Sequence, residues 1–105
     1  MAPTESASQS GMERIDWFYD VDYEILKYFY EYSQVEAYDF ETTPTLVARA
    51  LDYDRSYVSR EMSILSDVGV LGVRNTSAYS LTELGRRIVE SDIDEDDIPA
   101  DPRGA

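Results

Sequence analysis

The chain has 105 residues, and 22 acidic against nine basic side chains give it a net charge of −13. It has neither cysteine nor histidine, which excludes disulfides and thiolate metal sites and removes the usual general base. No apolar run approaches the roughly 20 residues that a membrane helix needs, so we expect a cytoplasmic protein with no membrane partner.

The acidic charge is concentrated at the two ends of the chain. Residues 1–43 carry a net charge of −8 and residues 92–105 one of −5, whereas residues 44–91 hold six acids and six arginines. Arginine outnumbers lysine eight to one, and an acidic, lysine-poor chain is what we expect of a salt-loving archaeon. In molar salt, exposed charges are screened within about 3 Å, so the acidic ends would repel an anionic partner less than in dilute buffer.

The first third of the chain predicts one long helix. Residues 1–12 are mostly small and polar and are expected to be disordered. From Asp20 to about Ser33 the apolar residues recur at helical spacing. They are Val21, Ile25, Leu26, Phe29 and Tyr32, and we expect Phe29 and Tyr32 to be core residues. Tyr38 to Thr42 then alternates like a short edge strand.

Two short helices follow, each with a predicted cap. Thr43 before Pro44 is a typical helix start, and this helix ends near Asp52. Its expected buried stripe is Leu46, Val47, Ala50 and Leu51. Asp54 caps the next helix, residues 55–68, whose expected buried positions are Val58, Met62 and Leu65. Gly69 is expected to end it.

Beyond Gly69 the pattern becomes strand-like. Residues 70–73 and 78–81 predict two strands joined by a polar turn at 74–77, which together form a wing over residues 70–81. Thr82 is expected to cap a last helix from Glu83 to about Ser91. Residues 92–105 predict an acidic disordered tail, and its acids do not fit a calcium loop, because Asp97 stands where glycine is needed.

This order of elements predicts a mainly α fold with a small β-hairpin wing, that is, a winged helix-turn-helix domain over residues 13–91. The turn between Leu51 and Arg55 has the length that a helix-turn-helix needs. Helix 55–68 buries one side and presents small polar and basic groups on the other, as a helix in the major groove of DNA must. The groups expected to bind DNA from this helix are Arg55, Ser56, Tyr57, Ser59, Arg60 and Ser63.

Further DNA contacts are expected from two other places. The wing turn offers Arg74, Asn75 and Thr76 to the DNA backbone or minor groove. Thr43 and Thr45, at a helix N-terminus, are candidates for holding a phosphate.

The chain also resembles the haloarchaeal phage phi-H repressor-like winged-helix proteins and, more distantly, MarR-type regulators. The resemblance covers about residues 16–91 and is most specific in the run Arg-Ser-Tyr-Val-Ser-Arg at residues 55–60. It implies a repressor-like DNA-binding fold in which Ser56, Tyr57, Ser59 and Arg60 are recognition-helix residues. The link from Ser33 to Thr43 is longer than the family pattern, and the wing tip lacks its usual glycine.

The aromatic residues near the first helix are too widely spread for one buried face. The aromatic residues that are not part of the core would form an exposed patch of the kind that marks an interface. The residues expected at a homodimer contact are Trp17, Phe18, Tyr19, Tyr23, Tyr28 and Tyr30. The alternative is that they pack on the last helix of their own chain.

We therefore expect a sequence-specific regulator of transcription that binds double-stranded DNA as a dimer. No nucleophile–base pair, phosphate loop or metal cluster is found in the sequence, so we expect no enzyme activity, no cofactor and no small-molecule ligand. The alternative is a winged helix that binds another protein, or an acidic decoy that imitates DNA.

Overall fold

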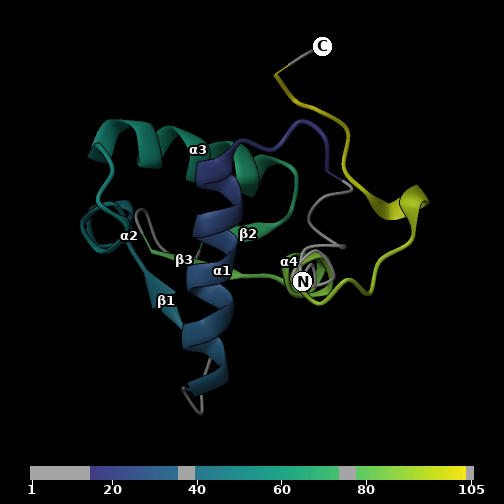
Figure 1. Cartoon of the computed structure of the whole chain (residues 1–105), viewed down its shortest axis with the longest axis horizontal. Helices are drawn as coiled ribbons and strands as arrows, with labels where there is room; N and C mark the ends of the chain where they lie inside the picture. The colour runs from purple at the N-terminus through teal and green to yellow at the C-terminus, as the bar shows by residue number, and fades with distance from the viewer. Residues whose placement is uncertain (1–14, 36–39, 74–77, 104–105) are drawn as a thin grey trace, which may run out of the picture.

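A computed structural model of the chain describes residues 15–35, 40–73 and 78–103. Its elements, in chain order, are α1 (Asp20–Val35), β1 (Glu41–Thr42), α2 (Pro44–Leu51), α3 (Arg55–Asp67), β2 (Leu71–Val73), β3 (Tyr79–Leu81), α4 (Glu83–Val89) and the short 3-10 helix η3 (Glu95–Asp97). The predicted order and fold class are confirmed: within these residues, four α-helices pack with a small three-stranded antiparallel sheet that contains the hairpin. Figure 1 shows α1 in the centre, with α2 and α4 on opposite sides of it.

Three side chains begin the later helices by capping them. The side-chain oxygens of Thr43, Asp54 and Thr82 each accept a hydrogen bond from the backbone N–H three residues later in the chain. The distances are 3.4, 3.2 and 3.1 Å. Each cap satisfies an N–H that the first helical turn leaves without a partner. All three predicted caps are confirmed, and they fix where α2, α3 and α4 start.

The two turns that flank α3 depend on left-handed backbone. Asp52, with φ of 65°, ends α2, and only three residues separate α2 from α3. Gly69, with φ of 86°, follows α3. Its N–H donates to the carbonyl of Ser66, and the N–H of Val70 donates to the carbonyl of Leu65. This pair of bonds is the Schellman motif, and glycine at its left-handed position carries no Cβ penalty.

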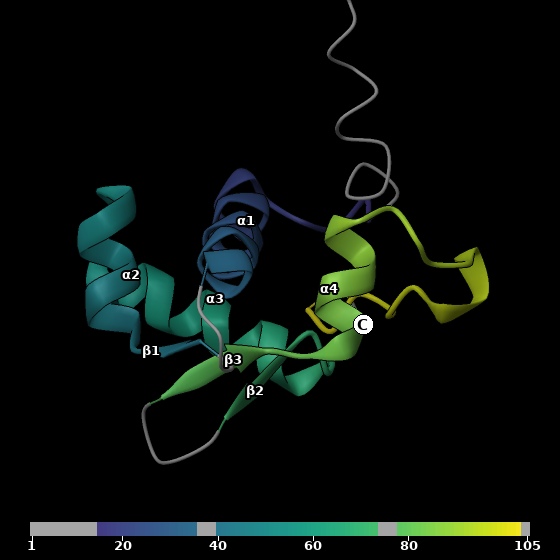
Figure 2. The same cartoon turned by 90° about the horizontal axis from the view of Figure 1, so that it is seen from below.

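The sheet has three antiparallel strands in the order β1-β3-β2. The hairpin pairs Leu71 with Leu81 and Val73 with Tyr79, and β1 adds to the far side of β3. The edge strand predicted from Tyr38 therefore forms at Glu41–Thr42, and Tyr38 itself lies outside the described residues. So does the wing turn, residues 74–77. Seen from below in Figure 2, the hairpin extends away from the helices.

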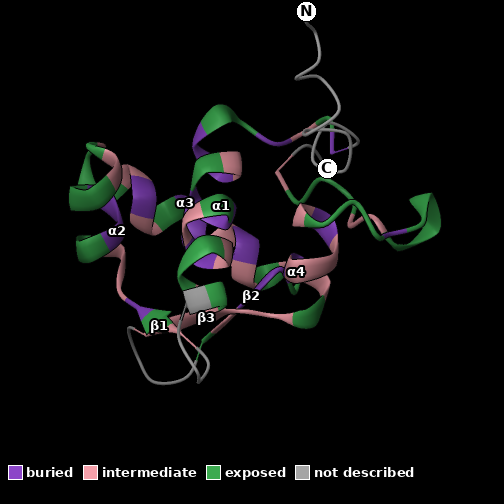
Figure 3. Cartoon of the chain, turned by 60° about the horizontal axis from the view of Figure 1, so that its bottom comes forward, coloured by how far each residue is buried: buried purple, intermediate pink, exposed green. Residues whose placement is uncertain are grey.

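The core lies between α1, α3 and the sheet (Figure 3). Val58, Met62 and Leu65 of α3 are fully buried, as predicted, and pack with α1 residues that include Phe29. Tyr32, expected in the core, is 45% exposed, because it lies one turn beyond Phe29 at the outer end of α1.

The buried side of α2 matches the expected one only in part. Val47 is buried and Leu51 packs half-buried on the core, as predicted. Its buried residues are Val47 and Ala48, whereas Leu46 is 50% exposed and Ala50 is also exposed. With eight residues, α2 has barely two turns. Its apolar residues therefore fit more than one stripe, and packing selects the side.

The C-terminal segment makes contacts that the expected acidic disordered tail would not make. Within residues 92–103, Ile93 is buried in the core and Pro99 accepts a hydrogen bond from Trp17 Nε1 at 2.9 Å. Figure 1 shows the segment, in yellow, running from α4 back toward the start of α1. The apolar residues between the acids give this segment side chains that it can bury. The high density of acidic residues had favoured the expectation of a disordered tail.

Candidate nucleic-acid interface

The helix α3 presents its predicted DNA-binding residues outside the core. Arg55, Ser56, Arg60 and Ser63 are exposed. Tyr57 and Ser59 are half-buried, at the edge of the same surface. The small serines let another backbone approach closely, while the arginines can reach beyond them.

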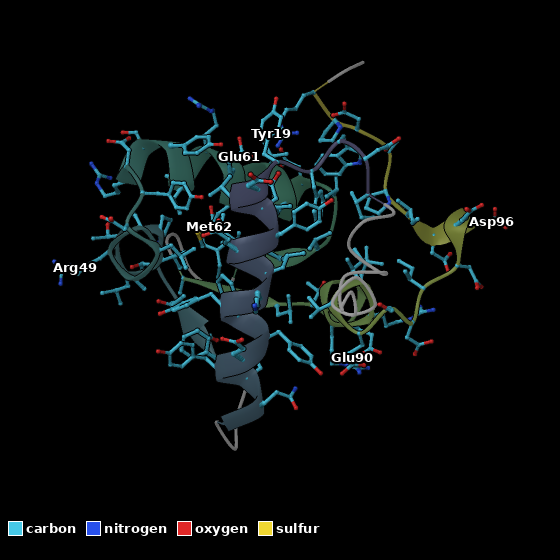
Figure 4. All side chains as sticks on the ribbon, viewed as in Figure 1. Tyr19, Arg49, Glu61, Met62, Glu90 and Asp96 are labelled. Atoms are coloured by element: carbon cyan, nitrogen blue, oxygen red, sulfur yellow. The ribbon has the colours of Figure 1, made fainter. Side chains whose placement is uncertain are left out.

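The arginines of the described chain fall into two groups. Arg86 pairs with Glu83 and Glu90, Arg87 with Asp97, and Arg103 with Asp22 and Glu61. By contrast, no carboxylate within residues 15–35, 40–73 and 78–103 forms an ion pair with Arg49, Arg55 or Arg60. These three are exposed and all lie on α2 or α3; in Figure 4, Arg49 extends outward from α2. Within the described residues, the arginines without an ion pair thus lie on the helix-turn-helix unit, whereas Lys27, a further cation without one, lies on α1.

Arg49 is absent from the DNA-binding residues predicted from sequence. The available signal was its place in the neutral stretch 44–91, on a helix whose residues 44–51 include no acid. Its position on the helix that precedes the turn suits a contact to the DNA backbone.

Aromatic residues tie the turn between α2 and α3 to its surroundings. Tyr53 and Tyr57 form an edge contact with 6.0 Å between ring centres. The Tyr53 hydroxyl donates to Glu24 of α1 at 2.9 Å. The guanidinium of Arg60 lies over the Tyr57 ring. These contacts orient the first turn of α3 against α1.

The remaining predicted DNA contacts are less defined. The Thr43 hydroxyl caps α2, and Thr45 is exposed in the first turn of that helix. Arg74, Asn75 and Thr76 lie outside the described residues.

Most residues of the predicted dimer contact have partners within their own chain. Phe18 is only 8% exposed and belongs to the core, which removes it from the expected surface patch. Trp17 and Tyr23 are half-buried and donate to the carbonyls of Pro99 and Ile15. The Tyr30 hydroxyl donates to Glu90, just after α4, at 2.9 Å, which is the packing on the last helix that stood as the alternative.

A smaller aromatic surface stays exposed at the outer end of α1. Tyr32 stacks on Phe40 with 5.1 Å between ring centres, and Tyr28 lies 4.7 Å from Tyr32. We call these three residues the aromatic cluster. Tyr19, at the other end of α1, is also exposed.

Two buried carboxylates lie at the contact between α1 and α3. Asp22 of α1 and Glu61 of α3 are both inaccessible to solvent and share one counter-charge, Arg103. Burial, together with the hydrogen bond to Glu61, raises the pKa of Asp22 from 3.8 to about 7. Two carboxylates beside one guanidinium favour retention of a proton by one of them.

The sequence held a signal for this cluster that the predictions missed. Glu61 lies at i+3 from Val58 and i−4 from Leu65, within the apolar stripe of α3. Asp22 holds the same kind of position before Leu26 and Phe29. An acid in a buried stripe requires a partner, and here the partner comes from the far end of the chain.

Comparison with known proteins gives one positive finding. A family model described as winged helix-turn-helix phage repressor matches residues 12–101. Comparison with curated proteins and with solved structures gave no match. Among the described residues, no group of acids could hold a metal ion, and no helix has the length and apolarity to cross a membrane.

Proposed function

Because this chain belongs to the winged helix-turn-helix phage repressor family, we propose that it is a repressor-like regulator of transcription that binds specific sites in duplex DNA. In this proposal, α3 enters the major groove and the wing contacts the backbone or the minor groove. The family is one of DNA-binding repressor domains and not an enzyme class. The groove, the contacts and the sequence preference are the parts that we propose.

One observation carries the proposal: the distribution of unpaired arginines. Arg49, Arg55 and Arg60 lie exposed on α2 and α3, while the described arginines elsewhere are engaged by carboxylates. In a chain with a net charge of −13, acids are abundant, so exposed arginines without an ion pair on two successive helices favour an anionic ligand. Arginine on a helix can pair bidentately with guanine or hold phosphate.

The roles follow from position on the helix. We assign base reading to Arg55, Ser56, Ser59, Arg60 and Ser63. Tyr57 meets a phosphate through its hydroxyl or a thymine methyl through its ring. Thr43 and Thr45, at the start of α2, and Arg49, in its last turn, hold backbone phosphates. Arg74, Asn75 and Thr76 contact DNA from the wing.

The charges on the exposed side of α3 disfavour the alternative of an acidic decoy that imitates DNA. An acidic decoy would display mainly carboxylates on its exposed face, yet Glu61 is buried, and Asp67 in the last turn is the one exposed acid of α3 beside Arg55 and Arg60. The charges among the proposed DNA-reading residues are both arginine. Binding to another protein in place of DNA is an outcome that the experiment below would reveal.

We also propose that two copies bind a two-fold site. The aromatic cluster is the best supported contact, because Tyr32 exposes an aromatic ring beside Tyr28 and Phe40 at the end of α1. Tyr19 remains a further candidate. Sedimentation of a Tyr32→Ser variant tests this contact: a dimer that persists unchanged would place the interface elsewhere.

The composition further suggests action in the cytoplasm of a salt-adapted cell. We propose that the acidic regions outside residues 44–91 take up cations as DNA approaches and thereby offset the counterions that DNA releases. DNA binding would then persist in molar salt.

Selection from a pool of random DNA duplexes tests the function directly. The full chain, in molar KCl, is incubated with the pool, and bound duplexes are amplified and sequenced. We expect a two-fold symmetric motif to be enriched. Enrichment of no sequence over a pool recovered without protein would reject sequence-specific binding and favour the protein-binding alternative.

A further inference from the structure

An ion cluster joins the C-terminal segment to the underside of the proposed recognition helix. Arg103 Nη2 lies 3.2 Å from Asp22 Oδ2 of α1 and also binds Glu61 Oε1 of α3. Its Nη1 donates to the Trp17 carbonyl at 3.0 Å. The two carboxylates are fully buried, and Arg103 is 81 positions from one and 42 from the other.

Aromatic rings hold the guanidinium in place. Its carbon lies 4.3 Å from the centre of the Tyr19 ring and 5.3 Å from that of Trp17. Trp17 also donates to Pro99, four residues before Arg103 in the same segment. Figure 4 shows Tyr19 and Glu61 close to each other where α1 begins beside α3. The end of the segment is therefore fixed by charge, by ring contacts and by a hydrogen bond.

The start of the segment is anchored as well. Arg87 Nε of α4 donates to the Asp92 carbonyl at 2.9 Å, and Ile93 enters the core. Residues 92–103 thus run as one strap from α4 to the contact between α1 and α3.

Glu61 connects this strap to the DNA-binding face. It lies four residues after Tyr57 and next to Arg60, so a shift of Glu61 moves both. Removing one partner of a buried ion pair leaves an uncompensated charge, which is strongly destabilising. Without Arg103, the carboxylates on α1 and α3 would lack their shared counter-charge, which would weaken the contact between the two helices.

We propose that residues 92–103 are a latch for the recognition helix, in which Arg103 is a positioning residue that holds α3 against α1 through Glu61 and Asp22. Arg103 itself does not contact DNA. Its effect on DNA binding rests on the function proposed above, whereas its effect on the order of α3 does not.

The test compares Arg103→Gln with Arg86→Gln in the full chain. Both changes remove one positive charge, but Arg86 pairs only with exposed carboxylates of its own helix region. Three readouts are used: hydrogen exchange of the α3 amides, fluorescence of Trp17, and affinity for a labelled duplex enriched by the wild-type chain. Trp17 is the only tryptophan of the chain and contacts the latch.

We expect R103Q to speed exchange in α3, change the Trp17 emission and weaken duplex binding about tenfold, since only the fraction with α3 in place binds. R86Q should match the wild type in all three. Equal behaviour of R103Q and R86Q would overturn the proposal.

A charge-free variant separates electrostatic positioning from general damage. In Asp22→Asn/Glu61→Gln/Arg103→Gln, no buried charge remains uncompensated, so we expect slow α3 exchange and duplex binding to return toward wild-type values. If the triple variant shows α3 exchange as fast and duplex binding as weak as R103Q, the latch is contradicted. If R103Q does not fold, the triple variant decides: recovery of the fold supports the latch, and loss of the fold in both variants assigns Arg103 to overall stability instead.

The two proposals fail in distinguishable ways. If the wild type enriches no duplex, the DNA-binding function is rejected, but the exchange and fluorescence comparison still tests the latch. If the wild type enriches a duplex that R103Q binds equally well with unchanged α3 exchange, only the latch is rejected.

Discussion

The guanidinium carbon of Arg60 lies 5.8 Å from the centre of the Tyr57 ring, so two proposed DNA-reading side chains contact each other on α3 before any ligand arrives. A cation over an aromatic ring is attracted by the electron density of its face. Tyr57 is in turn held against Tyr53, at the turn that leads into the helix. Arg60 is therefore partly positioned for binding.

Replacing this arginine should weaken DNA binding. We expect Arg60→Ala to reduce affinity for the selected duplex by about 1–3 kcal/mol and to relax preference at the base it reads. Fluorescence anisotropy titration at fixed KCl measures the change. Arg86→Ala is the control for loss of charge, and equal losses in the two variants would show that Arg60 has no specific role.

The response to salt provides a second prediction. A dimer with about six arginine–phosphate contacts would ordinarily have a slope of log affinity against log salt of about −5. If the acidic regions take up cations on binding, the slope between about 0.1 M and about 3 M KCl should be much shallower than this. A measured slope as steep as −5 would eliminate the proposed compensation.

Local signals account for what the sequence predicted well. The caps Thr43, Asp54 and Thr82 act within three residues of their own position, and Gly69 supplies a local left-handed turn. The exposed Arg55 and Arg60 follow from helical periodicity once Val58, Met62 and Leu65 define the buried side. Fold class and candidate DNA surface were predictable for this reason.

The buried acid Asp22 should make stability depend on pH. Burial and the hydrogen bond to Glu61 raise its pKa from 3.8 to about 7. Between these values the folded chain retains a proton that the unfolded chain releases, so the contribution of Asp22 to stability is greatest at low pH. That contribution is lost as pH rises toward 7, by up to about 1.4 kcal/mol per pH unit.

Asp22→Asn tests this coupling, because asparagine keeps an oxygen to accept the Tyr19 N–H. Urea unfolding measures the free energy of unfolding of both proteins across the pH range. As pH rises to about 7, that of the variant should increase relative to that of the wild type, and above this pH the difference should stay constant. Parallel stability curves for the two proteins would show that Asp22 titrates normally.

The packing of α4 gives a prediction about stability alone. A methyl group on Gly85 would collide with the Val70 carbonyl oxygen and the Leu81 side chain, whereas one on Gly72 would make ordinary contacts. Although alanine favours helix by about 1 kcal/mol over glycine, backbone overlap should dominate in Gly85→Ala.

Thermal unfolding of both alanine variants provides the comparison. We expect a clear loss of melting temperature for Gly85→Ala and little change for Gly72→Ala. A Gly85→Ala protein as stable as the wild type would mean that α4 can move away from the sheet without cost.

Contacts between distant parts of the chain explain what the sequence did not predict. Arg103 finds Glu61 across 42 positions, and no periodic pattern connects a C-terminal arginine to an acid in a central helix. Tyr32 follows the apolar stripe of α1 yet stays 45% exposed, with Phe40 stacked on its ring. Burial depends on what packs nearby, which spacing along one helix does not specify.

The central claim is that the unpaired arginines of the helix-turn-helix unit bind DNA. Its most direct test is the affinity of Arg55→Gln/Arg60→Gln for the selected duplex beside that of Lys27→Gln/Arg86→Gln, which removes the same charge from α1 and α4. We predict a loss of at least about 30-fold for the first pair and a change within about threefold for the second. Equal losses in the two would contradict the claim, because binding would then follow net charge and not the surface of α3.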